Sequence, residues 1–181
     1  LGLVGVALGT AIFPMLSRHA ARGDLERLGE DLTLGLRLVF LIGIPASVGL
    51  VLLAEPITAL LFEWGEFTAA DASRTARVIA CYGAGVWAYC GLPVLVRAFH
   101  ATGSPRPPVR IGLVMVGVNL VLNLILIWPL AEAGLAVATA VAAAGYLLAL
   151  TVVFARGVAP LDLLALAVSA VPAGADELGG T

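Results

Sequence analysis

The chain has 181 residues, of which 61% are hydrophobic and 12% are charged, and its mean hydropathy is +1.06. Soluble domains carry about 25% charged residues, and the core of so short a chain cannot hide this much apolar surface. The composition therefore excludes a soluble globular domain and predicts a polytopic membrane protein. The ten basic residues are all arginine and leave a formal net charge of −2. No run of them is basic enough to bind nucleic acid.

Five apolar segments approach the roughly 20 residues that a helix needs to cross about 30 Å of hydrocarbon. They are residues 2–17, 34–54, 76–97, 108–128 and 134–155. A weaker apolar stretch at 160–172 is interpreted as the start of a sixth helix, and the tail after it is expected to be disordered. The expected fold is an all-α transmembrane bundle of about five crossings over residues 1–156, with a partial helix and tail at 157–181. Because the chain opens with Leu inside a short apolar segment, we expect a fragment whose natural N-terminus lies upstream.

Arginine is distributed unevenly between alternate connections. Eight of the ten arginines lie in or beside residues 18–33, 97–110 and 156, whereas 55–73 and 129–133 hold acidic residues and no arginine. Basic residues near helix ends mark the cytoplasmic side of a membrane. Five crossings that alternate in direction place the first set inside and the second outside. The arginines of the cytoplasmic-side basic loops are Arg18, Arg22, Arg97, Arg106 and Arg110.

The outer connection carries the most distinctive motif. Glu55-Pro56 suits the first turn of a helix, because proline is tolerated there. Apolar side chains then recur at helical spacing, which predicts a short helix lying in the membrane interface and ending at Gly65. Thr68 and Asp71 resemble a capping box that begins the third crossing. The residues of this outer interfacial motif are Glu55, Pro56, Trp64, Gly65, Phe67, Thr68 and Asp71.

Motifs for catalysis or metal binding are absent from the sequence. It contains no phosphate-binding or dinucleotide-binding loop, no nucleophile elbow and no paired Cys or His ligands. His19 and His100 stand in predicted loops without a clustered carboxylate. An intramembrane hydrolase or lipid transferase would need converging Asp, His or Ser groups. We therefore expect no enzyme, no metal and no cofactor.

Two amides, Asn119 and Asn123, lie at membrane depth on one face of the fourth segment, together with Gly112. They are interpreted either as interhelical contacts, worth about 0.6 kcal/mol per hydrogen bond, or as the wall of a hydrated substrate cavity. An unpaired amide in hydrocarbon costs several kcal/mol, so both side chains should point into the bundle. The opposite positions suit lipid or packing, and they include Leu113, Leu120 and Leu124.

Several stretches resemble the MurJ/MviN family of lipid II flippases, in order from about residue 2 to residue 156. They are residues 5–18, 53–71, 97–103 with 107–110, and 119–123 with 134–139. The resemblance implies a fourteen-helix exporter of the multidrug/oligosaccharidyl-lipid/polysaccharide superfamily, in which two six-helix lobes alternate around a central cavity. The segments found here match helices eight to twelve. Because that family's cavity arginines lie mainly in the N-terminal lobe, we assign no residue of this sequence as a pyrophosphate ligand.

The function implied by the resemblance is transport of lipid II, an undecaprenyl-pyrophosphate-linked peptidoglycan precursor, from the inner to the outer leaflet of the bacterial cytoplasmic membrane. The implied partners are lipid II, which needs the N-terminal lobe as well, membrane lipids and cell-wall synthesis proteins, without nucleic acid. Two alternatives stay open. One is another polysaccharide-lipid flippase or a drug/cation antiporter of the same superfamily, which should lack the outer interfacial motif. The other is a transport-dead membrane scaffold.

Single-cysteine labelling tests the predicted sidedness in a variant that lacks Cys81 and Cys90. A cysteine in place of Arg106 should react with a membrane-impermeant reagent only from the cytoplasmic side. One in place of Glu66 should react only from the outside, because arginine-rich connections stay in the cytoplasm. Labelling of position 106 from outside and of position 66 from inside would contradict the predicted orientation.

Overall fold

The computed structural model describes residues 2–62 and 68–158, and within these ranges it is helical and contains no strand. Four stretches are long and apolar enough to cross a membrane, namely Leu25–Phe62, Ala69–Ala101, Arg106–Leu130 and Glu132–Gly157. The expected all-α class is confirmed. The predicted sixth helix and tail lie outside the described residues. The helices are α1 (Gly2–Arg22), α2 (Leu25–Phe62), α3 (Ala69–Gly83), α4 (Val86–Ala101), α5 (Arg106–Leu130) and α6 (Glu132–Gly157).

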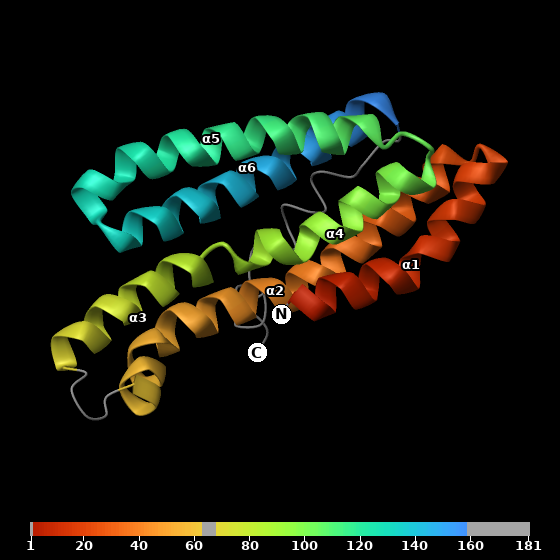
Figure 1. Ribbon diagram of the computed structural model, residues 1–181. Coiled ribbons are helices and arrows are strands. Elements are labelled where there is room, and N and C mark those ends of the chain that lie inside the picture. Colours follow the sequence, from red (N-terminus) through yellow and green to blue (C-terminus); the bar gives the residue numbers. More distant parts are fainter. Residues whose placement is uncertain (1, 63–67, 159–181) are drawn as a thin grey trace, which may run out of the picture.

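The helices lie side by side in a long bundle (Figure 1). Helices α3 and α4 follow one another along its middle, α5 and α6 form a hairpin on one side of them, and α2 and α1 lie on the other. Helix α4 packs against α1, α2 and α6, whereas α5 packs almost entirely against α6. Helix α1 corresponds to the first predicted crossing, but it is not among the four stretches that meet the length and composition criteria.

The core lies where α2, α4 and α6 meet. Leu32 and Val39 of α2 pack in one cluster with Leu95 and Phe99 of α4 and Phe154 of α6, and all five are fully buried. The rings of Phe99 and Phe154 meet edge to face with their centroids 5.1 Å apart. Because lipid tails are as apolar as these side chains, close van der Waals packing stabilises this core more than exclusion from water does.

The third membrane crossing is built from two helices, whereas the sequence predicted one uninterrupted segment at 76–97. Helix α3 ends at Gly83 and α4 begins at Val86. A Cβ on Gly85 would lie 2.9 Å from Cα of Ala140 in α6, so α6 approaches the break closely. The break frees backbone donors, and Trp87 N–H donates to the Ser47 hydroxyl of α2 at 2.9 Å. A bond from a neighbouring helix thus replaces one that a continuous helix would make.

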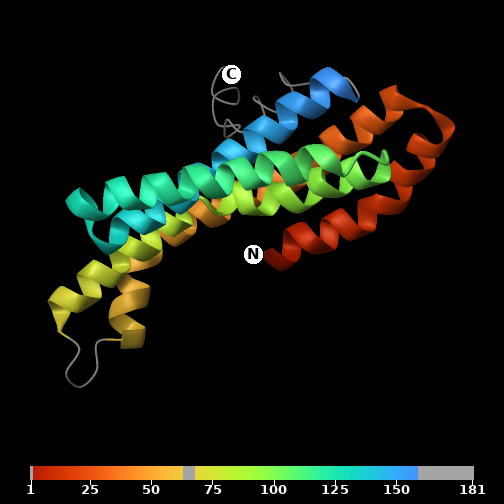
Figure 2. The same cartoon turned by 45° about the horizontal axis from the view of Figure 1, so that its top comes forward.

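Helix α2 is longer than the predicted crossing at 34–54, because it runs from Leu25 to Phe62 without interruption. The residues expected to form a separate interfacial helix after Glu55 instead continue α2, with Pro56 inside it. The last turns of α2 bend away from the axis of the rest of the helix (Figures 1 and 2). A proline inside a helix removes one backbone hydrogen bond and kinks it, which accounts for the bend.

Replacing Gly85 by alanine should destabilise the bundle. The added Cβ would lie 2.8 Å from Cβ and 2.9 Å from Cα of Ala140, so α6 would have to move. Overpacking of this kind costs about 1–3 kcal/mol. Gly117→Ala in α5 is the matched control, because a Cβ there meets nothing within 4 Å and alanine favours a helix. Thermal unfolding in detergent should separate the two variants, and equal melting temperatures would contradict the close approach.

Candidate functional site

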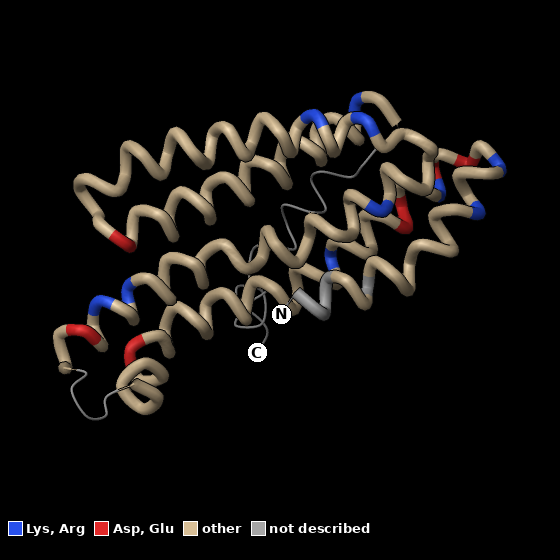
Figure 3. Tube along the Cα trace, in the orientation of Figure 1, with Lys and Arg blue, Asp and Glu red and all other residues tan. Residues whose placement is uncertain are grey.

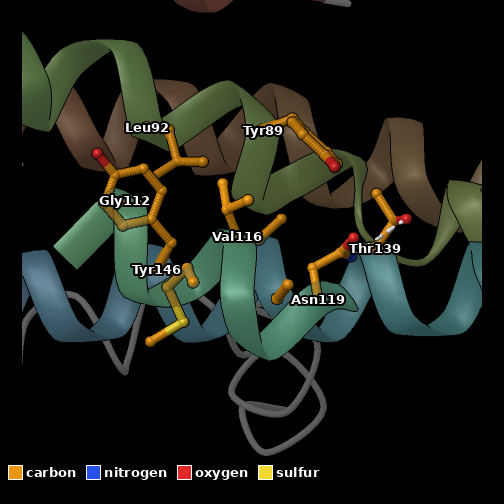
Figure 4. A pocket seen from close by; sticks show the side chains of 10 residues that line it. Tyr89, Leu92, Gly112, Val116, Asn119, Thr139 and Tyr146 are labelled. Carbon is orange, nitrogen blue, oxygen red and sulfur yellow. Dashed lines mark hydrogen bonds between the residues drawn. The ribbon is translucent and has the colours of Figure 1, made fainter. Parts of the chain in front are cut away.

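A groove of about 390 Å³ opens between α4 and the α5–α6 hairpin. It is lined mostly by apolar side chains, and Val116 of α5 lies in it together with Leu92 of α4. Asn119 and Thr139 lie together at one end of the groove, and Tyr146 lies at the other (Figure 4). The groove is thus an apolar surface with polar atoms near its two ends.

The two amides form a hydrogen-bonded chain that reaches α6. Asn123 Nδ2 donates to Asn119 Oδ1 at 2.9 Å, and Asn119 Nδ2 donates to Thr139 Oγ1 at 3.5 Å. The Thr139 hydroxyl in turn donates to the carbonyl of Leu135 at 2.8 Å. Asn123 Oδ1 is buried and has no hydrogen-bond partner among the residues that the structure describes. The predicted inward orientation of both amides is confirmed, and Leu120 on the opposite side of α5 is exposed.

Both interpretations of the amide pair therefore keep support. The bond to Thr139 joins α5 to α6, as an interhelical contact would. Asn119 also lines the groove, as a cavity residue would. The cavity role of Asn119 and Asn123 stays a prediction.

The other end of the groove is fixed by a bond that sequence analysis missed. Tyr146 of α6 donates its hydroxyl to the carbonyl of Pro108, in the first turn of α5, at 2.8 Å. A Cβ on Gly112 would lie 3.2 Å from that hydroxyl oxygen, so glycine leaves room for the ring. The sequence placed Gly112 on the same face of α5 as the two amides. In the structure, the close approach of the Tyr146 ring requires a small residue at this position.

Charged residues gather at the two ends of the bundle (Figure 3). Of the residues assigned to cytoplasmic-side loops, Arg18 and Arg22 are exposed on the last turns of α1, and Arg106 and Arg110 are exposed on the first turns of α5. The helices α1 and α5 thus present these four arginines at the same end. Which side of the membrane this end occupies stays a prediction.

Arg97 differs from those four. It lies on α4, only half-buried, and its Nη1 donates to the Thr10 hydroxyl of α1. A Cβ on Gly9 would lie 3.1 Å from Cδ of Arg97 and 3.4 Å from its Nε. The side chain therefore lies against α1, a contact that the sequence did not predict.

His19 has an acidic neighbour, in contrast to the sequence interpretation. Its Nε2 lies 3.3 Å from Oδ2 of Asp31, across the turn that joins α1 to α2. The spacing along the chain hid this pair because an antiparallel hairpin brings the residues together. No group of three or more His, Cys, Asp or Glu side chains that could hold a metal ion occurs in the described parts of the chain.

The opposite end of the bundle holds the described part of the outer interfacial motif. The predicted capping box is confirmed, since Thr68 Oγ1 accepts from Asp71 N–H at 3.3 Å and the Asp71 carboxylate accepts from Thr68 N–H at 3.2 Å. Glu55 and Pro56 are exposed on α2. The remaining motif residues lie outside the described ranges; these are Trp64, Gly65 and Phe67.

An ion pair at this end was not predicted. Arg74 Nε of α3 lies 2.8 Å from Oε1 of Glu132, at the start of α6. The pair joins α3 to the start of α6, and its two residues are 58 positions apart in the chain. Both side chains are about half exposed, so the pair contributes little to stability.

Comparisons with known proteins agree on one family. The family model for the lipid II flippase MurJ matches residues 1–172. The chain is 36% identical over 143 residues to a probable lipid II flippase MurJ of Vibrio cholerae, covering 79% of the chain and 27% of that protein. It is 33% identical over 141 residues to the lipid II flippase MurJ of Burkholderia cenocepacia, covering 78% of the chain and 27% of that protein.

A solved structure agrees with these sequence matches. The structure of a lipid II flippase MurJ in an inward closed conformation matches with a TM-score of 0.75 at 25% identity, covering 93% of this chain and 35% of that one. The chain thus spans about a quarter of the length of the curated relatives named above. The resemblance of the separate motifs is confirmed as a match over most of the chain.

Replacing Thr139 by valine should weaken the contact between α5 and α6. The change removes the acceptor of Asn119 Nδ2, and interhelical bonds in membranes contribute about 0.6 kcal/mol on average. Thr151→Val is the matched control, because its hydroxyl bonds only to the carbonyl of Leu147 within α6. Chemical unfolding in detergent should show the larger loss of stability for Thr139→Val. The same loss for both variants would mean that the bond across the helices contributes nothing.

Proposed function

Since the chain belongs to the lipid II flippase MurJ family, we propose that it forms part of a transporter that moves lipid II from the inner to the outer leaflet of the bacterial cytoplasmic membrane. The observation that carries this proposal is the family match over residues 1–172. The family match favours lipid II flippases over other polysaccharide-lipid flippases and over drug/cation antiporters. The proposed role is transport of a lipid-linked substrate, without chemical change to it.

The groove between α4 and the α5–α6 hairpin supplies a surface that suits this role. The headgroup of a lipid-linked precursor carries sugar and peptide groups that must exchange water for other hydrogen-bond partners inside the membrane. Asn119 and Thr139 offer donor and acceptor atoms at the edge of the groove. Asn123 does not line the groove, but it donates to Asn119 Oδ1 and so holds that side chain in place. We propose that the polar atoms of Asn119 and Thr139 contact the headgroup in passing, while the apolar walls hold no charge that would trap it.

The break between α3 and α4 supports a transporter that changes shape. The Trp87 N–H bonds to Ser47 of another helix instead of to its own. Interrupted membrane helices of this kind are common where transporters bind or rearrange around a substrate. In this proposal the whole path needs further helices beyond those described, because one bundle has no opposite wall against which access can alternate.

Replacing Asn119 and Asn123 together by leucine should impair transport while membrane levels stay near normal. The change removes the amide of Asn119 from the groove wall and the Asn123 amide that bonds to it, but keeps side chains of similar size. The variants are expressed, with the flanking sequence of the gene, in cells depleted of their own lipid II flippase. Growth and the appearance of lipid II at the outer leaflet are measured together with protein abundance. Leu120→Ala with Leu124→Ala, on the exposed face of α5, is the matched control.

Three other outcomes would count against the proposal. Parallel losses of abundance and transport would show that the amides act as interhelical contacts. Normal transport in the double leucine variant would remove the groove from the substrate path. Failure of the unsubstituted protein to restore growth would contradict the flippase function itself.

A further inference from the structure

Arg97 is held in place by a polar contact that leaves most of its hydrogen-bonding capacity open. In the described ranges, Arg27 and Arg74 pair with carboxylates, but no salt bridge involves Arg97. Its side-chain partner is the hydroxyl of Thr10, which accepts from Nη1. A guanidinium carries five N–H donors in a rigid planar fork. The remaining donors are therefore available to an anion that the described side chains do not provide.

Two residues of α1 fix the direction of this side chain. The Thr10 hydroxyl donates its own hydrogen to the carbonyl of Val6 at 2.6 Å, so its lone pairs are the atoms left to face Arg97. Gly9 lets Cδ and Nε lie against the helix, because a Cβ there would come within 3.1 Å of Cδ. A half-buried arginine oriented before a ligand arrives loses less conformational entropy on binding than a free surface arginine does.

The position of Arg97 along the bundle suits the phosphate of a lipid. It lies four residues before the end of α4 at Ala101, which is about 6 Å along the helix axis. The same end of the bundle carries the exposed arginines of α1 and α5 (Figure 3). The phosphates of membrane lipids lie just outside the hydrocarbon that such helices cross, so an arginine near this end of α4 is within reach of them. The fork of an arginine matches two phosphate oxygens at once.

We propose that Arg97, oriented by Gly9 and Thr10, binds the pyrophosphate of the lipid-linked substrate in the leaflet from which transport begins. The proposal rests on the proposed flippase function and names one contact for it. Sequence analysis assigned no pyrophosphate ligand on this chain, because the cavity arginines of the family that it resembles lie mainly in the N-terminal lobe. The packing of α1 against α4 separates Arg97 from the exposed arginines of the basic loops.

Lipid binding to the purified protein, produced with the flanking sequence of its gene, tests the contact. Affinity for lipid II and for phosphatidylglycerol is measured by native mass spectrometry for Arg97→Gln and Arg97→Lys. Loss of a charge-assisted bidentate contact should weaken lipid II binding at least about tenfold in Arg97→Gln. Arg97→Lys should lie between, because an ammonium keeps the charge but not the fork. Arg37→Gln, an exposed arginine on α2, is the matched control and should bind normally.

Thr10→Val separates positioning from folding. It removes the hydroxyl that orients Arg97 but leaves the charge, so it should weaken lipid II binding less than Arg97→Gln while the melting temperature stays near that of the unsubstituted protein. Unchanged lipid II binding in Arg97→Gln would overturn the proposal. An equal loss of phosphatidylglycerol binding would also overturn it, since the site would then hold any phospholipid.

The failure of this contact and the failure of the flippase function give different results. If the unsubstituted protein restores growth but Arg97→Gln binds lipid II normally, only the contact is wrong. If the unsubstituted protein neither restores growth nor binds lipid II, both are wrong. If it binds lipid II through Arg97 without restoring growth, the contact stands and the transport function is wrong.

Discussion

Inside hydrocarbon, no water is present to bond the backbone, and each membrane span must satisfy its own N–H and C=O groups. This constraint makes every described span helical. It also applies at the break between α3 and α4, where the helix is interrupted. Where the third crossing breaks around Gly85, the Trp87 N–H finds the Ser47 hydroxyl of α2. The Ser47 hydroxyl thus satisfies one of the backbone donors that the break leaves open, and turn bonds around Gly85 satisfy others. The bond to Ser47 also joins the start of α4 to α2.

The parts of the fold that follow from local physics were predictable from the sequence. Apolar length located the spans, and the Thr68–Asp71 spacing located the start of α3, because a capping box involves only neighbouring residues. Contacts between distant residues were not predictable. The close approach at Gly85 involves Ala140 of α6, and a single sequence contains no signal that joins these two residues. The pairing of His19 with Asp31 was missed for the same reason.

The candidate site likewise has features that the sequence predicted and features that it did not. The inward direction of the Asn119 and Asn123 side chains followed from the cost of placing an amide in lipid; in the structure Asn119 bonds to Thr139 of α6 and Asn123 bonds to Asn119. The groove itself did not follow, because three helices form its walls. The contact of Arg97 with α1 was not predicted, since its partner Thr10 lies 87 residues earlier in the chain.

Some polar side chains of the described helices have all their hydrogen bonds within the chain, and others do not. Thr33, Thr58 and Thr151 donate to the carbonyl four residues earlier in their own helix, which completes their bonding without a ligand. Asn123 Oδ1 and the remaining N–H groups of Arg97 instead have no hydrogen-bond partner among the described residues. Asn123 lies on α5, which packs against α6, whereas Arg97 lies on α4 against α1. Because an open hydrogen-bonding group in a membrane is costly unless something fills it, these two positions, unlike the threonines, are where a polar partner would recover that cost.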